Sequence, residues 1–92
     1  MDIYKDLQKL ACHYGLQNQL FKTKEELHEL KVAINGYIEG VDKKAHVLEE
    51  IADVEIMTAQ LKLLLDGEAE VDKVKQFKVN RQLERIARGV ER

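Results

Sequence analysis

Two pairs of acidic residues in this 92-residue chain lie where an apolar side chain is expected. Glu26 and Glu29 are three residues apart, and so are Glu50 and Asp53. At 3.6 residues per helical turn, Glu26 and Glu50 project into the apolar faces of their segments, with Glu29 and Asp53 at the edges. Burying an unpaired carboxylate costs several kcal/mol. Protonation, basic partners or bound cations must therefore compensate.

The spacing of the two pairs favours cations. If the segments around them form an antiparallel helical hairpin, residues whose numbers have the same sum lie at one level. Glu29 then faces Glu50, and Glu26 faces Asp53, because both pairs have the same sum. Four carboxylates stacked as two level pairs provide hard oxygen ligands, which suit Mg²⁺ or Mn²⁺ rather than zinc.

A solvated charged surface is the alternative interpretation of these acids. The chain has 17 acidic residues, so a single pair at this spacing arises by chance and means little. Two pairs in matching register, both on apolar faces, favour the metal site.

The elements that must position these acids are helices. There is no proline, and the five glycines divide the chain into segments rich in good helix formers. The pattern predicts an all-α protein with four helices: Asp2 as N-cap to Tyr14, ended by Gly15; Leu16 to Ile38; Asp42 as N-cap to Leu65; and Glu68 to Arg88. Residues 1–92 are expected to form one domain.

The helix expected over 42–65 is apolar on two sides. One arc holds Val47, Ile51, Val54, Met57, Leu61, Leu64 and Leu65, and the other holds Leu48, Ala52, Ile56, Ala59 and Leu63. Four helices of this length cannot cover both arcs, so we expect burial by partner subunits in an obligate homo-oligomer.

Composition limits the partners and the compartment. A net charge of −2 gives no overall attraction to nucleic acid or to an anionic membrane. The single Cys12 cannot form an internal disulfide, and the first residues lack the order of a signal peptide. We expect a cytoplasmic protein that binds neither nucleic acid nor membrane. The three histidines share no metal-ligand spacing, which predicts surface or capping roles.

The acidic segments resemble the motifs of a known family. Residues 25–30, EELHEL, match the EExxE motif of MazG-like, all-α nucleotide pyrophosphohydrolases, and residues 49–54, EEIADV, match their ExxD motif. Flanking residues fit as well: His13, Tyr14, Gly15, Gln19 and Leu20 upstream, and Lys78 and Arg81 downstream. The resemblance covers nearly the whole chain and is greatest to the short, single-domain members. The apolar run Leu63–Leu65 departs from the pattern.

The resemblance implies a fold and a reaction. The fold is a four-helix MazG-like bundle completed by oligomerisation, as a dimer or a dimer of dimers. The reaction is Mg²⁺-dependent hydrolysis of a nucleoside triphosphate between the α and β phosphates, which gives a monophosphate and pyrophosphate and would clear nucleotides from the pool.

Roles follow for the residues that match the motifs. Glu26, Glu29, Glu50 and Asp53 are expected to bind the metal, and Glu25 to bridge it or to orient the attacking water. Lys22, Lys78 and Arg81 are candidates for binding phosphate. For Lys78 and Arg81, a solvated cationic stripe near a helix C-terminus is the alternative.

Two other classes of function remain open. A non-enzymatic oligomeric scaffold would explain the two-sided helix but not the acids at core positions. A nucleic-acid-binding helical protein would use the cationic residues of 78–85, against the negative net charge.

Overall fold

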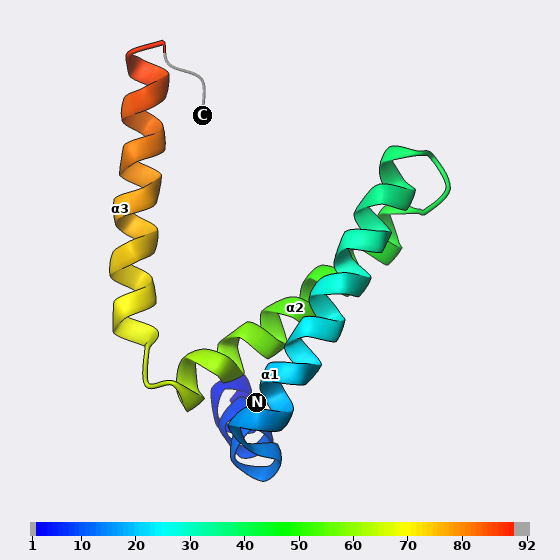
Figure 1. The fold of residues 1–92 in the computed structure, drawn as a ribbon, viewed down its shortest axis with the longest axis vertical. Coiled ribbons are helices and arrows are strands. Elements are labelled where there is room, and N and C mark those ends of the chain that lie inside the picture. Colours follow the sequence, from blue (N-terminus) through cyan, green and yellow to red (C-terminus); the bar gives the residue numbers. More distant parts are fainter. Residues whose placement is uncertain (1, 90–92) are drawn as a thin grey trace.

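The computed structural model describes residues 2–89, and these residues form three α-helices without a β-strand. The helices are α1 (Ile3–Ile38), α2 (Lys44–Leu64) and α3 (Glu68–Ala87), as Figure 1 shows. The prediction of an all-α protein is confirmed. Among residues 2–89, no helix has both the length and the apolar character that crossing a membrane requires.

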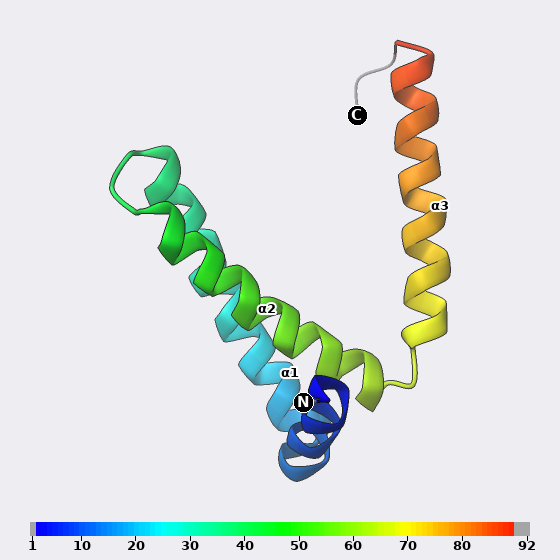
Figure 2. The ribbon, with the colours of Figure 1, turned by 180° about the vertical axis from the view of Figure 1, so that it is seen from behind.

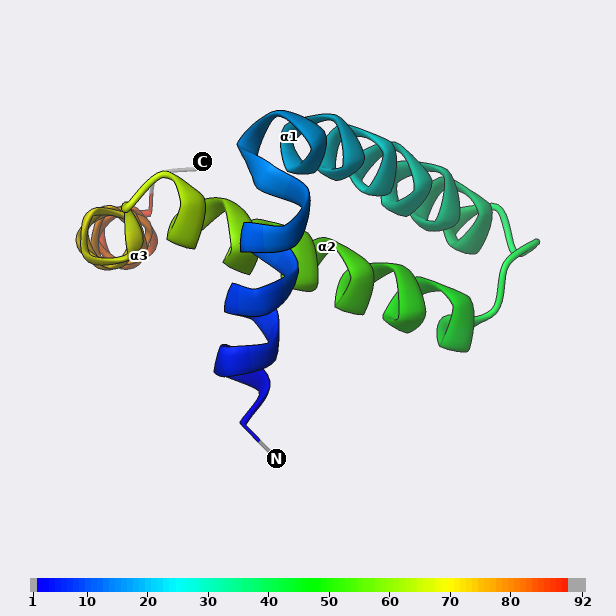
Figure 3. The ribbon, with the colours of Figure 1, turned by 90° about the horizontal axis from the view of Figure 1, so that it is seen from below.

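Helix α1 contains both helices expected before residue 39, and a kink at Gly15 separates them. Gly15 has φ 83° and ψ 166°, a conformation that is essentially restricted to glycine. The chain therefore changes direction sharply, and residues before the kink run steeply across the remainder of α1 (Figure 3). Asp2 is the N-cap as predicted, because its Oδ1 accepts the backbone N–H groups of Tyr4 and Lys5 at 3.1 and 3.4 Å.

The long part of α1 and α2 form the predicted antiparallel hairpin (Figure 2). The side chains that join the two helices define the register: Gln19 Nε2 donates to Gln60 Oε1 at 2.7 Å. This pair has the same sum of residue numbers as the two predicted carboxylate pairs. The register that the acids predicted is therefore confirmed at another level of the hairpin.

The interface between α1 and α2 is unusually polar. Its buried side chains are Gln19, Thr23, Glu26, Glu50 and Gln60, together with Ala11, Ala33 and Met57. Internal hydrogen bonds satisfy part of the polar set, since Thr23 Oγ1 donates to the Gln19 carbonyl oxygen at 2.6 Å. Larger apolar side chains of the two helices, such as Leu30, Val54 and Leu61, are only partly buried.

The turn between α1 and α2 differs from the prediction at Asp42. Helix α2 begins at Lys44, and its N-cap is Lys43, which makes no capping side-chain hydrogen bond. Asp42 Oδ1 instead lies 3.0 Å from Nδ1 of His46. The backbone N–H of Asp42 donates to the Gly36 carbonyl oxygen at 3.0 Å. A Cβ at Gly36 would overlap the Asp42 carboxyl group, so alanine there would force the Asp42 side chain to shift.

Helix α3 leaves the hairpin and extends away from it (Figures 1 and 2). It contacts α2 only, and none of its residues is buried. Its exposed apolar side chains are Val74, Phe77, Val79, Leu83 and Ile86. One copy of the described chain is therefore a helical hairpin with an outlying third helix. The predicted four-helix bundle, completed by oligomerisation, would need further copies.

Candidate metal centre

Three carboxylates from the two helices of the hairpin meet at one place. Glu26 and Glu29 of α1 and Glu50 of α2 each offer an oxygen, and these atoms lie within 4.8 Å of one another. Glu26 and Glu50 are only 7% and 8% exposed, whereas Glu29 is exposed. The cluster thus has a buried floor and an open side.

Each buried carboxylate has one oxygen near a basic side chain and one without a partner. Oε1 of Glu26 lies 3.3 Å from Nζ of Lys22, and Oε1 of Glu50 lies 3.4 Å from Nε2 of His46. Among residues 2–89, the two Oε2 atoms are buried and have no hydrogen-bond partner. Orphaned buried acceptors are costly and rare in proteins. A hard divalent cation would satisfy them, so the donor set fits Mg²⁺ or Mn²⁺.

Burial and the neighbouring charges of the cluster affect the pKa of the Glu50 carboxyl. Burial raises the pKa of the Glu50 carboxyl above its ordinary range, and the negative charges of Glu29 and Asp53 raise it further. His46 opposes this effect by favouring the charged form of the Glu50 carboxyl. Without a cation, the site therefore disfavours the ionised form of Glu50, which is the form that binds metal.

Lys22 and Glu25 lie at the margin of the cluster. The Lys22 ammonium is 3.5 Å from Oε2 of Glu25, and the Glu25 side chain is mostly exposed. The hydrogen bond to Glu26 raises the pKa of Lys22, so this side chain is a cation at neutral pH. A positive charge is therefore held beside the carboxylates.

His46 is a member of the site that the histidine spacing did not reveal. It lies between Asp42 and Glu50, and its hydrogen bond with Asp42 raises the pKa of the imidazole. The signal in the sequence was the spacing of four residues on each side of His46: Asp42 precedes α2, and Glu50 lies one turn further along the helix. His46 thereby contacts one carboxylate of the cluster.

Three predicted site residues lie outside the cluster. Asp53 is partly buried on α2 and acts on Glu50 through its charge, but it does not belong to the group of three that lies within 4.8 Å. Lys78 and Arg81 lie on exposed α3, which makes no packing contact with α1. Arg81 instead lies 5.6 Å from the centre of the Phe77 ring. Within one chain, neither Lys78 nor Arg81 joins the carboxylates.

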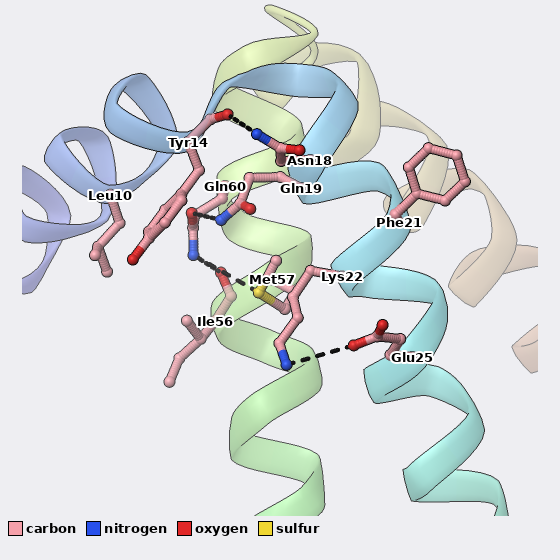
Figure 4. A pocket seen from close by; sticks show the side chains of 10 residues that line it. All are labelled: Leu10, Tyr14, Asn18, Gln19, Phe21, Lys22, Glu25, Ile56, Met57 and Gln60. Carbon is pink, nitrogen blue, oxygen red and sulfur yellow. Dashed lines mark hydrogen bonds and ion pairs between the residues drawn. The ribbon is translucent and has the colours of Figure 1, made fainter.

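A cavity of about 520 Å³ adjoins the cluster. Lys22 and Glu25 form its wall nearest the carboxylates, and the side chains of Tyr14, Gln19, Ile56 and Gln60 line the remainder (Figure 4). Pockets of this size hold small organic ligands. The structure thus combines a candidate cation site with space for a larger molecule next to it.

No family model, curated protein or solved structure matches the chain.

Proposed function

We propose that this chain is a Mg²⁺-dependent nucleoside triphosphate pyrophosphohydrolase of the MazG-like kind. The observation that carries the proposal is the group of three carboxylates, two of which have a buried oxygen without a partner. A purely structural role gives no reason to bury these groups. A divalent cation does, and the adjoining cavity would accommodate the rest of a nucleotide.

The chain's own residues have distinct tasks in this reaction. Glu26, Glu29 and Glu50 would hold the cation, and Asp53 would add negative charge beside them. When bound, the cation would supply Lewis acidity that neutralises phosphate charge and activates water. Water adds to the α phosphorus as the bond from that phosphorus to the oxygen bridging to the β phosphate breaks, and pyrophosphate leaves. Glu25, whose side chain is mostly exposed, would orient this water and accept its proton.

Cations on the substrate side complete the charge balance. A triphosphate carries about four negative charges at neutral pH, which the acidic cluster alone would repel. Lys22 already lies beside the cluster and provides one positive charge. Lys78 and Arg81 would act only if α3 of another copy brought them to the site.

The homo-oligomer belongs to the same proposal. Val79, Leu83 and Ile86 share one face of helix α3 and are 54%, 58% and 73% exposed, and such an apolar patch seldom stays uncovered. A dimer or a dimer of dimers would cover them and would make α3 part of a four-helix bundle.

We expect the double variant Leu83→Lys and Ile86→Lys to shift the oligomer toward monomer, because two charges would enter the proposed interface. Light scattering coupled to gel filtration measures the mass. Glu84→Lys, which places a lysine on another face of α3, is the matched control and should assemble normally. A wild-type mass of one chain at micromolar concentration would contradict the proposed assembly.

The direct test is turnover. Purified protein incubated with each common ribo- and deoxynucleoside triphosphate and Mg²⁺ is expected to release pyrophosphate and the monophosphate. EDTA should abolish release, and Mn²⁺ should restore it at least in part, because both ions accept hard oxygen ligands. Absence of pyrophosphate from every substrate would favour the oligomeric scaffold, for which the exposed apolar faces are the supporting observation.

A further inference from the structure

His46 contacts a carboxyl group at each of its two ring nitrogens. Nδ1 lies 3.0 Å from Oδ1 of Asp42, and Nε2 lies 3.4 Å from Oε1 of Glu50. The imidazole is a rigid ring with its nitrogens on different edges, so a contact at one nitrogen restricts where the other can point. His46 therefore connects the turn before α2 with one carboxylate of the cluster.

Asp42 is itself held by the end of α1. The backbone N–H groups of Val41 and Asp42 both donate to the Gly36 carbonyl oxygen, at 2.8 and 3.0 Å. The Asp42 carboxyl group lies in the space that a Cβ at Gly36 would occupy. The position of the His46 ring thus depends on α1, through the turn, as well as on its own helix α2.

The contact with His46 restrains the carboxylate of Glu50 at one oxygen only. Oε1 faces the imidazole, whereas Oε2 is buried and has no hydrogen-bond partner among residues 2–89. A carboxylate without a fixed partner rotates about its terminal bond, since that torsion has broad minima. A contact at Oε1 restricts this rotation and leaves Oε2 available for another ligand. Glu26 has the same division, but its basic partner Lys22 is shared with Glu25.

We propose that His46, held by Asp42, is a positioning residue for the divalent cation: its contact with Oε1 of Glu50 keeps Oε2 of that carboxylate available to the ion. This inference rests on the proposed function, which supplies the cation. It goes beyond the two acidic motifs, which include neither Asp42 nor His46. A ligand that is already ordered loses less conformational freedom when it binds, and the partners of metal ligands typically contribute about 10- to 100-fold in metal affinity.

Metal binding tests this role without turnover. The full chain, treated with EDTA and dialysed, is titrated with Mn²⁺, and the EPR signal of the free ion gives Kd. We expect His46→Ala to raise Kd about tenfold or more, because Glu50 loses its partner at Oε1. His28→Ala is the matched control, since His28 is also an exposed histidine of the hairpin but takes no part in these contacts. Equal Kd values for wild type and His46→Ala would overturn the proposal.

A double-mutant cycle shows whether Asp42 acts through His46. Asp42→Asn keeps the size of the side chain and removes the charge that holds the ring, so it should raise Kd for Mn²⁺. In the His46→Ala background the same substitution should have no further effect, because the ring through which it acts is gone. Additive losses would overturn the proposal. Gly36→Ala, which forces the Asp42 carboxyl group to shift, should follow the same pattern. Circular dichroism checks the fold of each variant, and should Gly36→Ala fail to fold, the Asp42→Asn cycle decides.

Turnover keeps this inference and the proposed function distinguishable. With His46→Ala, the Mg²⁺ concentration for half-maximal pyrophosphate release should rise, whereas kcat at saturating Mg²⁺ should stay close to that of wild type. A loss of kcat that saturating Mg²⁺ does not recover would overturn the positioning role and leave the proposed hydrolase intact. If no triphosphate is hydrolysed, the proposed function fails, and the Mn²⁺ titrations decide the inference alone. A wild-type chain that binds no Mn²⁺ would overturn both.

Discussion

Replacing Glu50 with glutamine is expected to lower pyrophosphate release by more than about 100-fold, while the protein stays folded. Loss of a group that only orients a metal ligand typically costs 10- to 100-fold, so loss of a buried ligand should cost more. Glutamine keeps the size of the side chain and removes the charge that would grip the cation. Glu49→Gln is the matched control: Glu49 is adjacent and exposed, and its variant should keep near-normal turnover. Full activity of Glu50→Gln would contradict the ligand assignment.

The same substitution should stabilise the protein when metal is absent. Because the pKa of Glu50 is raised, the folded protein binds this proton more tightly than the unfolded chain does. In EDTA, the stability that this proton provides is present in acid and is lost as the pH rises through the folded-state pKa. Glutamine does not titrate, so the variant should have the higher Tm at neutral pH, and the difference should vanish below the ordinary pKa of glutamate. Mg²⁺ should raise the Tm of wild type more than that of the variant.

Replacing Gly15 with alanine is expected to destabilise the protein. At φ 83° and ψ 166°, a Cβ adds about 1–3 kcal/mol of strain although the space around it is open. In a domain of this size, each kcal/mol lowers Tm by roughly 4–8 °C. Relief of the strain would change the direction of residues 3–14 and would move Tyr14 out of the cavity beside the cluster, so turnover should fall as well.

Gly67→Ala is the control for this prediction. Gly67 also lies between two helices, as the N-cap of α3, but its φ is −119°. The nearest atom to a Cβ added there is the Leu65 carbonyl oxygen at 4.0 Å. Its Tm should stay within a few degrees of wild type at the same protein concentration. If both variants melt together with the wild type, the kink at Gly15 does not require glycine.

Much of the hairpin could be predicted from the sequence because its signals are local. The glycine positions and the absence of proline indicated where the helices break. Asp2 was recognisable as an N-cap because it is an aspartate directly before the first helical segment. The register followed from requiring two pairs of acids to face each other, and the Gln19–Gln60 bond has that same register. Of the predicted metal ligands, the structure gathers Glu26, Glu29 and Glu50.

The rest depended on contacts that periodicity does not encode. Large apolar side chains of α1 such as Leu20, Leu27 and Ile34 are 38%, 48% and 41% exposed. Smaller side chains such as Thr23 and Ala33 are buried. Large side chains would hold the helices apart, whereas small ones allow close approach. Asp42 was expected to cap α2, but the tight turn at Gly36 directs it to His46.

The outward course of α3 has a consequence for dosage. If its cations serve the active centre of a neighbouring copy, no isolated polypeptide holds a complete set of catalytic groups. Output would then rise more steeply than the amount synthesised, because each newly made chain must first encounter another. The expression level would then control the activity, and at low concentration the protein would have little activity even without an inhibitor.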